Sequence, residues 1–95
     1  MSEFSIELGA EQDFLAALRW YAEQSQGAGE AFAKAVDVAF DEIASAPSRW
    51  PAFDGVFRYR IVNRFPYLIV YRIRDASVIV VAVAHSSRDV YWHER

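Results

Sequence analysis

The sequence predicts an α+β fold in which two helices pack on one sheet of about four strands. Three observations support this prediction. Apolar and polar residues alternate at the N-terminus, which is typical of a half-buried strand. Apolar residues then recur at helical spacing in two consecutive segments, and the alternation returns in the second half of the chain.

The first strand is predicted for residues 4–8, FSIEL, where every second side chain is apolar. Gly9 ends this alternation. Residues 10–24 follow helical spacing instead, and the acidic residues in their first turn suit the positive end of the helix dipole. The apolar face of this helix contains Phe14, Leu18 and Tyr21.

A predicted turn over residues 25–29, SQGAG, leads to a second helix. That helix ends before Pro47, because the residue that precedes a proline is pushed out of helical geometry. Two helices joined by a short turn predict an antiparallel helical hairpin. Apolar residues recur at the i, i+3, i+4 and i+7 positions of the second helix, namely Phe32, Ala35, Val36, Ala39, Phe40, Ile43 and Ala44.

Three further strands are predicted after a loop over residues 47–55. Residues 57–61 place Phe57, Tyr59 and Ile61 on one face and arginines on the other. After a break at residues 63–66, alternation resumes from residue 67 to the turn 74–77, and 78–84 is an unbroken apolar run that suits a strand covered on both faces. These strands should form an antiparallel meander, which the N-terminal strand joins in the same sheet. A short C-terminal segment, 85–95, follows.

Length and composition indicate a single cytoplasmic domain over residues 1–95. The absence of cysteine excludes disulfides and thiolate metal sites. No carboxylate pair stands at metal-ligand spacing with His85 or His93, so we expect neither a metal nor a cofactor. The N-terminus is too polar for a signal peptide, and the run 78–84 is far shorter than the roughly 20 residues of a membrane helix.

Charge is unevenly distributed along the chain. Residues 1–55 contain three basic and ten acidic residues, whereas residues 56–95 contain seven basic and three acidic ones, which together give the net charge of −3. All seven of those later basic residues are arginine, whose planar fork suits phosphate and carboxylate groups. We therefore expect acidic helices on one side of the molecule, and on the other a face of arginine and aromatic side chains that meets a target.

Four segments occur in an order that resembles a known family. They are WYAEQS, the proline-flanked RWP, FPYLIVYR and AVAHSSRD, and together they are similar to the RelE/ParE toxins of type II toxin–antitoxin systems. The resemblance covers nearly the whole chain. It implies a small bacterial toxin that arrests growth by attacking translation or DNA topology and is neutralised by a cognate antitoxin encoded beside it.

One branch of this family resembles metal-free ribonucleases that cut mRNA on the ribosome. In such an mRNA interferase a base activates the ribose 2′-hydroxyl, while arginines stabilise the charged phosphorane. The resemblance then implies a catalytic set of Arg58, Arg60, His85, Arg88 and Tyr91. Against this interpretation, Leu68 stands where these nucleases usually carry a basic residue, and the pI of about 5.3 is low for a protein that enters a ribosomal site.

The other branch resembles inhibitors of DNA gyrase, which act by binding and do not need the complete basic set. FPYLIVYR followed by AVAHSSRD is more similar to this branch, so we favour gyrase inhibition, with the RelE-like ribonuclease as the alternative and an inactive antitoxin-binding member as a third. An antitoxin would add a helix or strand to the toxin in a hetero-oligomer. The expected contacts with the target or the antitoxin are Arg64, Arg72, Arg74, Trp92 and Trp20, the last because it cannot share a helix face with its neighbour Tyr21.

Overall fold

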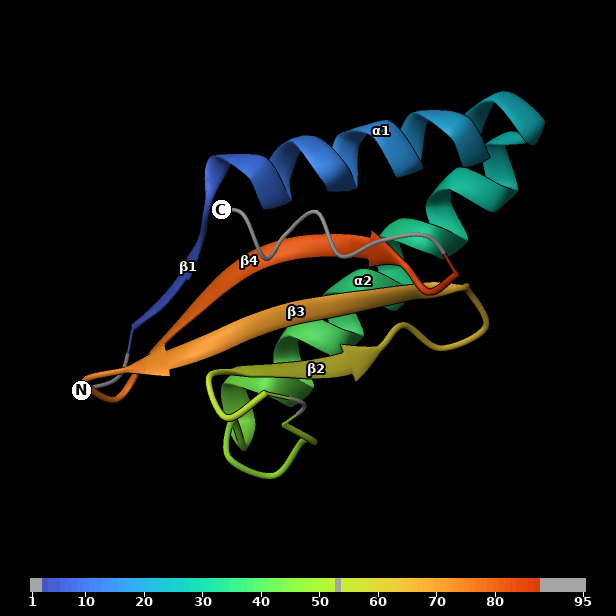
Figure 1. Cartoon of the computed structure of the whole chain (residues 1–95). Coiled ribbons are helices and arrows are strands. Elements are labelled where there is room, and N and C mark those ends of the chain that lie inside the picture. Colours follow the sequence, from blue (N-terminus) through green and yellow to red (C-terminus); the bar gives the residue numbers. More distant parts are fainter. Residues whose placement is uncertain (1–2, 53, 88–95) are drawn as a thin grey trace.

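The computed structural model describes residues 3–52 and 54–87 of the chain (Figure 1). Two helices and a four-stranded sheet give the α+β fold that the sequence predicts. The elements are, in chain order, strand β1 (Phe4–Ile6), helices α1 (Leu8–Gln24) and α2 (Gln26–Ser45), and strands β2 (Phe57–Ile61), β3 (Tyr67–Arg74) and β4 (Ser77–His85).

The sheet has the strand order β1-β4-β3-β2. The last three strands form the predicted antiparallel meander, and β1 pairs with β4 in the parallel direction, so the sheet is mixed. The N-terminal strand therefore belongs to the same sheet as the three strands that follow the helical hairpin, as predicted (Figure 1). Neither helix in the described part of the chain is long and apolar enough to cross a bilayer.

The main core lies between the helices and one face of the sheet. Phe32 of α2 is fully buried at its centre and contacts aromatic rings of α1 and of the segment that leads into β3. The predicted apolar face of α2 is confirmed except for Ala44, which is exposed. The buried members of this core are Ala10, Ala17, Phe32, Val36, Ala39, Ile43, Val62, Ile69, Tyr71, Val78, Val80 and Val83.

The connection between the helices differs from the prediction. Only Ser25 separates α1 from α2, so the expected turn over residues 25–29 is wrong. The Ser25 backbone N–H donates to the Tyr21 carbonyl at 3.1 Å, and its side-chain oxygen accepts from the Ala28 N–H at 3.0 Å. Gly29 lies inside α2, where a Cβ would come within 3.0 Å of Ala22. This glycine therefore permits close packing of the helices and does not form a turn.

The first helix also begins earlier than predicted, at Leu8. The Glu7 N–H still bonds to the Val80 carbonyl in the sheet at 2.9 Å, while its carbonyl already accepts from the Glu11 N–H at 3.0 Å. Strand β1 is accordingly only three residues long. Past the end of β1, helix α1 lies next to β4. The Asp13 side chain of α1 accepts a hydrogen bond from the Val83 N–H of β4 at 3.1 Å.

A β-bulge shifts the side-chain alternation of β4, which is buried on both faces. Across the register shift, Tyr71 of β3 lies opposite Val80 while Val70 lies opposite Ala82, so β4 has one more residue than β3 there. The bulge changes which side chains face the helices. Val80 and Val83 belong to the main core, whereas a second cluster on the opposite face contains Val70, Val81, Ala82 and Ala84. The prediction of a strand covered on both faces is confirmed.

The turn between β3 and β4 contains unfavourable backbone conformations. Asp75 and Ala76 have φ angles of 52° and 65°, and only glycine adopts such angles without steric cost. We expect Ala76→Gly to raise the free energy of unfolding by about 0.5–1 kcal/mol in urea melts. The control is Ala31→Gly at an exposed site within α2, which should lower the free energy of unfolding by about 1 kcal/mol. Equal destabilisation by both changes would contradict this account of the turn.

Candidate functional site

The arginines of β2 point toward the C-terminal end of α2 and the loop that follows it. Arg58 donates two hydrogen bonds from Nη1, to the carbonyl oxygens of Ser48 at 3.2 Å and Trp50 at 2.6 Å. Main-chain carbonyls beyond a helix end need donors from elsewhere, and the guanidinium supplies them. Arg58 thus holds the loop 48–50 against the edge strand.

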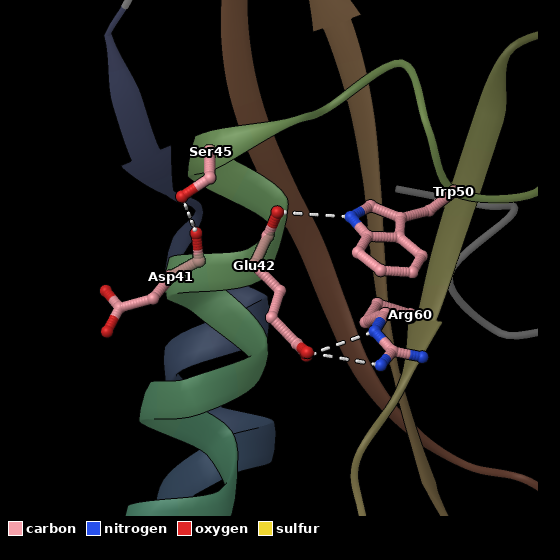
Figure 2. A network of polar contacts seen from close by, with 5 residues as sticks. All are labelled: Asp41, Glu42, Ser45, Trp50 and Arg60. Atoms are coloured by element: carbon pink, nitrogen blue, oxygen red, sulfur yellow. Dashed lines mark hydrogen bonds and ion pairs between the residues drawn. The ribbon is translucent and has the colours of Figure 1, made fainter.

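Arg60 is bound by the helix and the loop together (Figure 2). Its Nε and Nη2 donate to the Glu42 carboxylate at 3.1 and 3.3 Å, a bidentate pair. Its guanidinium also lies 4.1 Å from the centre of the Trp50 ring, and the indole N–H donates to the Glu42 carbonyl oxygen at 3.1 Å. Bidentate pairing combined with stacking on an aromatic ring is specific to arginine. We call Glu42, Trp50 and Arg60 the latch.

Tyr71 completes the attachment of the loop. Its hydroxyl donates to the Pro47 carbonyl oxygen at 2.6 Å from a fully buried ring. Burial raises the pKa of the Tyr71 phenol, and the nearby Arg58 guanidinium partly opposes that rise. The phenol therefore stays neutral at physiological pH and keeps its hydrogen bond.

These contacts correct the expected separation of charge. We expected the arginines of residues 57–61 on the side of the molecule away from the acidic helices, but Arg60 pairs with Glu42 of α2. The reason is the direction of the strand's side chains: Phe57 packs into the cluster on the far face of the sheet, so Arg58 and Arg60 point to the helix side. The two arginines do share one face, as their spacing predicts.

A surface groove of about 550 Å³ adjoins the latch. One wall is the outer face of α2, where Val38 is 48% exposed, and the other is formed by the loop and β2. Arg49 also lines the groove, with its guanidinium carbon 5.1 Å from the Trp50 ring centre. The groove is lined by Val38, Asp41, Glu42, Ser45, Ala46, Arg49, Trp50 and Arg60.

The predicted contact residues that the structure describes do not converge on this groove. Trp20 is 55% exposed on α1, whereas its neighbour Tyr21 packs against the core, as their adjacency predicts. Arg64 is exposed in the turn before β3, with a φ of 72°. Arg72 and Arg74 lie at the other end of β3, the first beside Glu7 and the second exposed. The arginines are therefore distributed over both ends of the sheet.

His85 ends β4 and is engaged locally. Its Nδ1 accepts from the Ser87 backbone N–H at 3.3 Å and lies 2.9 Å from the Ser87 hydroxyl. In a neutral ring the proton is then on Nε2. Because β3 lies between β2 and β4, the backbones of Arg60 and His85 are at least two strand spacings apart, about 10 Å.

Three predicted residues, Arg88, Tyr91 and Trp92, lie outside the described residues. Within residues 3–52 and 54–87, no three His, Asp or Glu side chains form a group that could hold a metal ion. Arg60 was among the predicted site residues, whereas its partners Glu42 and Trp50 were not. No sequence pattern links an acidic residue of an amphipathic helix to a strand arginine so far along the chain.

The latch suggests a test of its contribution to folding. We expect Arg60→Ala to lower the free energy of unfolding by about 1 kcal/mol, a modest value because the pair is partly solvated. Arg60→Lys should cost nearly as much, since lysine provides neither the planar fork nor the stacking. Urea melts would measure both, with Arg74→Ala at the exposed end of β3 as the control. Full rescue by lysine would contradict the described latch geometry.

The described residues define a small α+β protein in which the two arginines of β2 make structural contacts, with a groove beside them. The chain belongs to the ParE family: the family model for the ParE toxin of the type II toxin–antitoxin system parDE matches residues 5–90. This confirms the resemblance found in the sequence.

A solved structure titled as the chromosomal ParDE toxin–antitoxin system from P. aeruginosa has a similar fold. The TM-score is 0.66 with 16% sequence identity, and the match covers 90% of this chain and 96% of that one. Among curated proteins, none matches the chain.

Proposed function

We propose that this protein is a toxin that arrests bacterial growth in the cytoplasm by binding DNA gyrase and is neutralised by a cognate antitoxin. Membership of the ParE toxin family supports the toxin role. The motifs FPYLIVYR and AVAHSSRD support the gyrase branch of the family.

The contacts that Arg58 and Arg60 make within the protein are the main reason to propose binding instead of RNA cleavage. A metal-free ribonuclease needs arginines that are placed at the scissile phosphate and stabilise its transition-state charge. Here Arg58 donates to two loop carbonyls, and Arg60 is paired with Glu42. Turning either side chain to a phosphate would break these contacts.

Leu68 strengthens the same argument. It stands where the nuclease branch usually carries a basic residue, and it packs against the apolar cluster on the far face of the sheet. An apolar side chain in that cluster contributes to packing and cannot stabilise a phosphorane. A binding-type inhibitor has no need of a charge there.

Several exposed side chains suit contacts with a protein partner. Trp20 presents a large aromatic surface on α1, and aromatic residues of this kind often dominate the affinity of interfaces. Val38 in the groove and the exposed cations Arg64 and Arg74 lie on other parts of the surface. Such dispersed contacts suit a partner that wraps around the toxin.

The ribonuclease alternative is tested directly in a translating extract. We expect the purified protein to leave reporter mRNA intact when its 5′ ends are mapped by primer extension. Site-specific cuts that vanish in Tyr91→Phe would instead assign the chain to the ribonuclease branch. That substitution removes only a hydroxyl, and loss of proton transfer slows such an enzyme roughly 10²–10⁴-fold.

A further inference from the structure

Arg72 is a charged side chain that lies between two apolar side chains, Phe57 and Ile79, on the face of the sheet away from the helices. We call these two apolar side chains the floor. Arg72 lies on the inner strand β3, directly opposite Phe57 of β2 and Ile79 of β4. Side chains that lie opposite one another share a face of the sheet, and both neighbours pack in the apolar cluster on the face away from the helices. The guanidinium therefore emerges from apolar surroundings.

The charge of Arg72 is poorly compensated within the part of the chain that the structure describes. Its Nε is buried and has no hydrogen-bond partner among those residues. The carboxylate of Glu7, at the junction of β1 and α1, approaches Nη2 only to 3.8 Å, which is beyond hydrogen-bonding distance. The side chain nevertheless remains 28% exposed, so its terminal nitrogens can be reached from solvent.

A second positive charge lies near Arg72. Arg74 lies two residues further along the same face, about 7 Å away, and is exposed. Glu7 is 41% exposed and therefore largely solvated, and Glu3 and Asp75 at the same end of the sheet are exposed as well. An anionic group with a single negative charge would compensate the charge of Arg72. A carboxylate suits this role, because it can accept two parallel hydrogen bonds from the planar guanidinium.

We propose that Arg72 binds an Asp or Glu side chain of the antitoxin, carried on a segment whose apolar residues lie against the floor. The inference rests on the proposed pairing with an antitoxin and assigns the residue that would anchor it. An apolar floor suits an amphipathic protein segment better than a hydrated phosphate backbone. Arg72 is then kept for binding, at a cost to the stability of the free toxin, because an undercompensated charge there disfavours folding.

The first test uses the free protein. Arg72→Met keeps the apolar stem and removes the charge, so the urea midpoint should stay unchanged or rise. Arg74→Met, at the exposed end of the same strand, is the matched control and should change little. If Glu7 were the true partner of Arg72, both Arg72→Met and Glu7→Gln would lower the midpoint, and the inference would be overturned.

The second test uses the protein encoded next to this gene as the probe, in calorimetric titrations of each variant. Arg72→Met and Arg72→Lys should weaken binding about thirtyfold, the effect typical of an interface hot spot, while Lys34→Met, which removes an exposed cation of α2 outside the proposed site, should leave binding unchanged. Unchanged binding by both Arg72 variants would overturn the inference and leave the pairing intact.

Failure of the unaltered toxin to bind that protein would overturn the proposed pairing itself, and the inference with it. A titration with a random DNA duplex distinguishes the remaining possibility. If Arg72→Met weakened binding to the duplex and left binding to the protein unchanged, Arg72 would be a phosphate contact and the proposal would be wrong.

Discussion

Production of this protein without a partner is expected to stop the growth of the bacteria that make it. The expectation follows from its membership of the ParE toxin family. The proposed inhibition of gyrase would block an essential step of DNA metabolism. Colony counts after induction measure the effect, and they should fall almost to zero. Co-expression of the neighbouring open reading frame should restore them to the level of uninduced cells.

Two results of that experiment have separate meanings. Normal growth with abundant soluble, folded protein would contradict an active toxin and indicate an inactive antitoxin-binding member of the family. Arrest that the neighbouring protein does not relieve would contradict the pairing and leave toxicity in place. Circular dichroism of the purified protein establishes whether it is folded in either case.

Removal of the central aromatic ring should cause the largest loss of stability. Phe32 is fully buried, and its ring centre lies 4.9 Å from that of Tyr21 and 5.2 Å from that of Phe65. Phe32→Ala should lower the free energy of unfolding by about 3–5 kcal/mol, through lost burial and the cavity left behind. Because small domains are stable by only about 5–15 kcal/mol, much of the chain should be unfolded at 37 °C.

The matched control is Leu15→Ala on α1, where the side chain is 49% exposed and its truncation should cost less than about 1 kcal/mol. Thermal and urea melts followed by circular dichroism compare the two variants. Similar losses for both would contradict the assignment of Phe32 to the centre of the core. Phe32→Ala should also abolish growth arrest, whereas Leu15→Ala should retain it.

The elements of this fold were predictable because their periodicity was strong. The apolar spacing of α2 and the alternation in β2 and β3 each determine a local conformation, and the protein has a helix and strands at those places. The bulge in β4 was not predictable, because an unbroken run such as 78–84 carries no sign of where the pairing shifts. The parallel pairing of β1 depends on how the hairpin returns the chain to the sheet.

The errors in prediction share one physical cause, which is that tertiary packing decides what a residue contacts and the local sequence does not show it. A glycine-containing segment indicates a turn locally, yet Gly29 meets the needs of helix packing against Ala22. Alternation likewise showed that Arg58 and Arg60 share a face, but it could not tell which face lies under the helices. Partners such as Glu42 are fixed only by tertiary packing. A candidate site drawn from strand arginines alone therefore mixed structural residues with contact residues.

A gyrase supercoiling reaction tests the central claim most directly. Relaxed plasmid, purified gyrase and ATP are incubated with increasing amounts of this protein, and the topoisomers are separated on agarose, with the Phe32→Ala variant as the unfolded control. We predict that supercoiling is lost in proportion to added protein and is recovered when the neighbouring antitoxin is supplied. Full supercoiling at a large molar excess of folded, growth-arresting protein would contradict gyrase as the target.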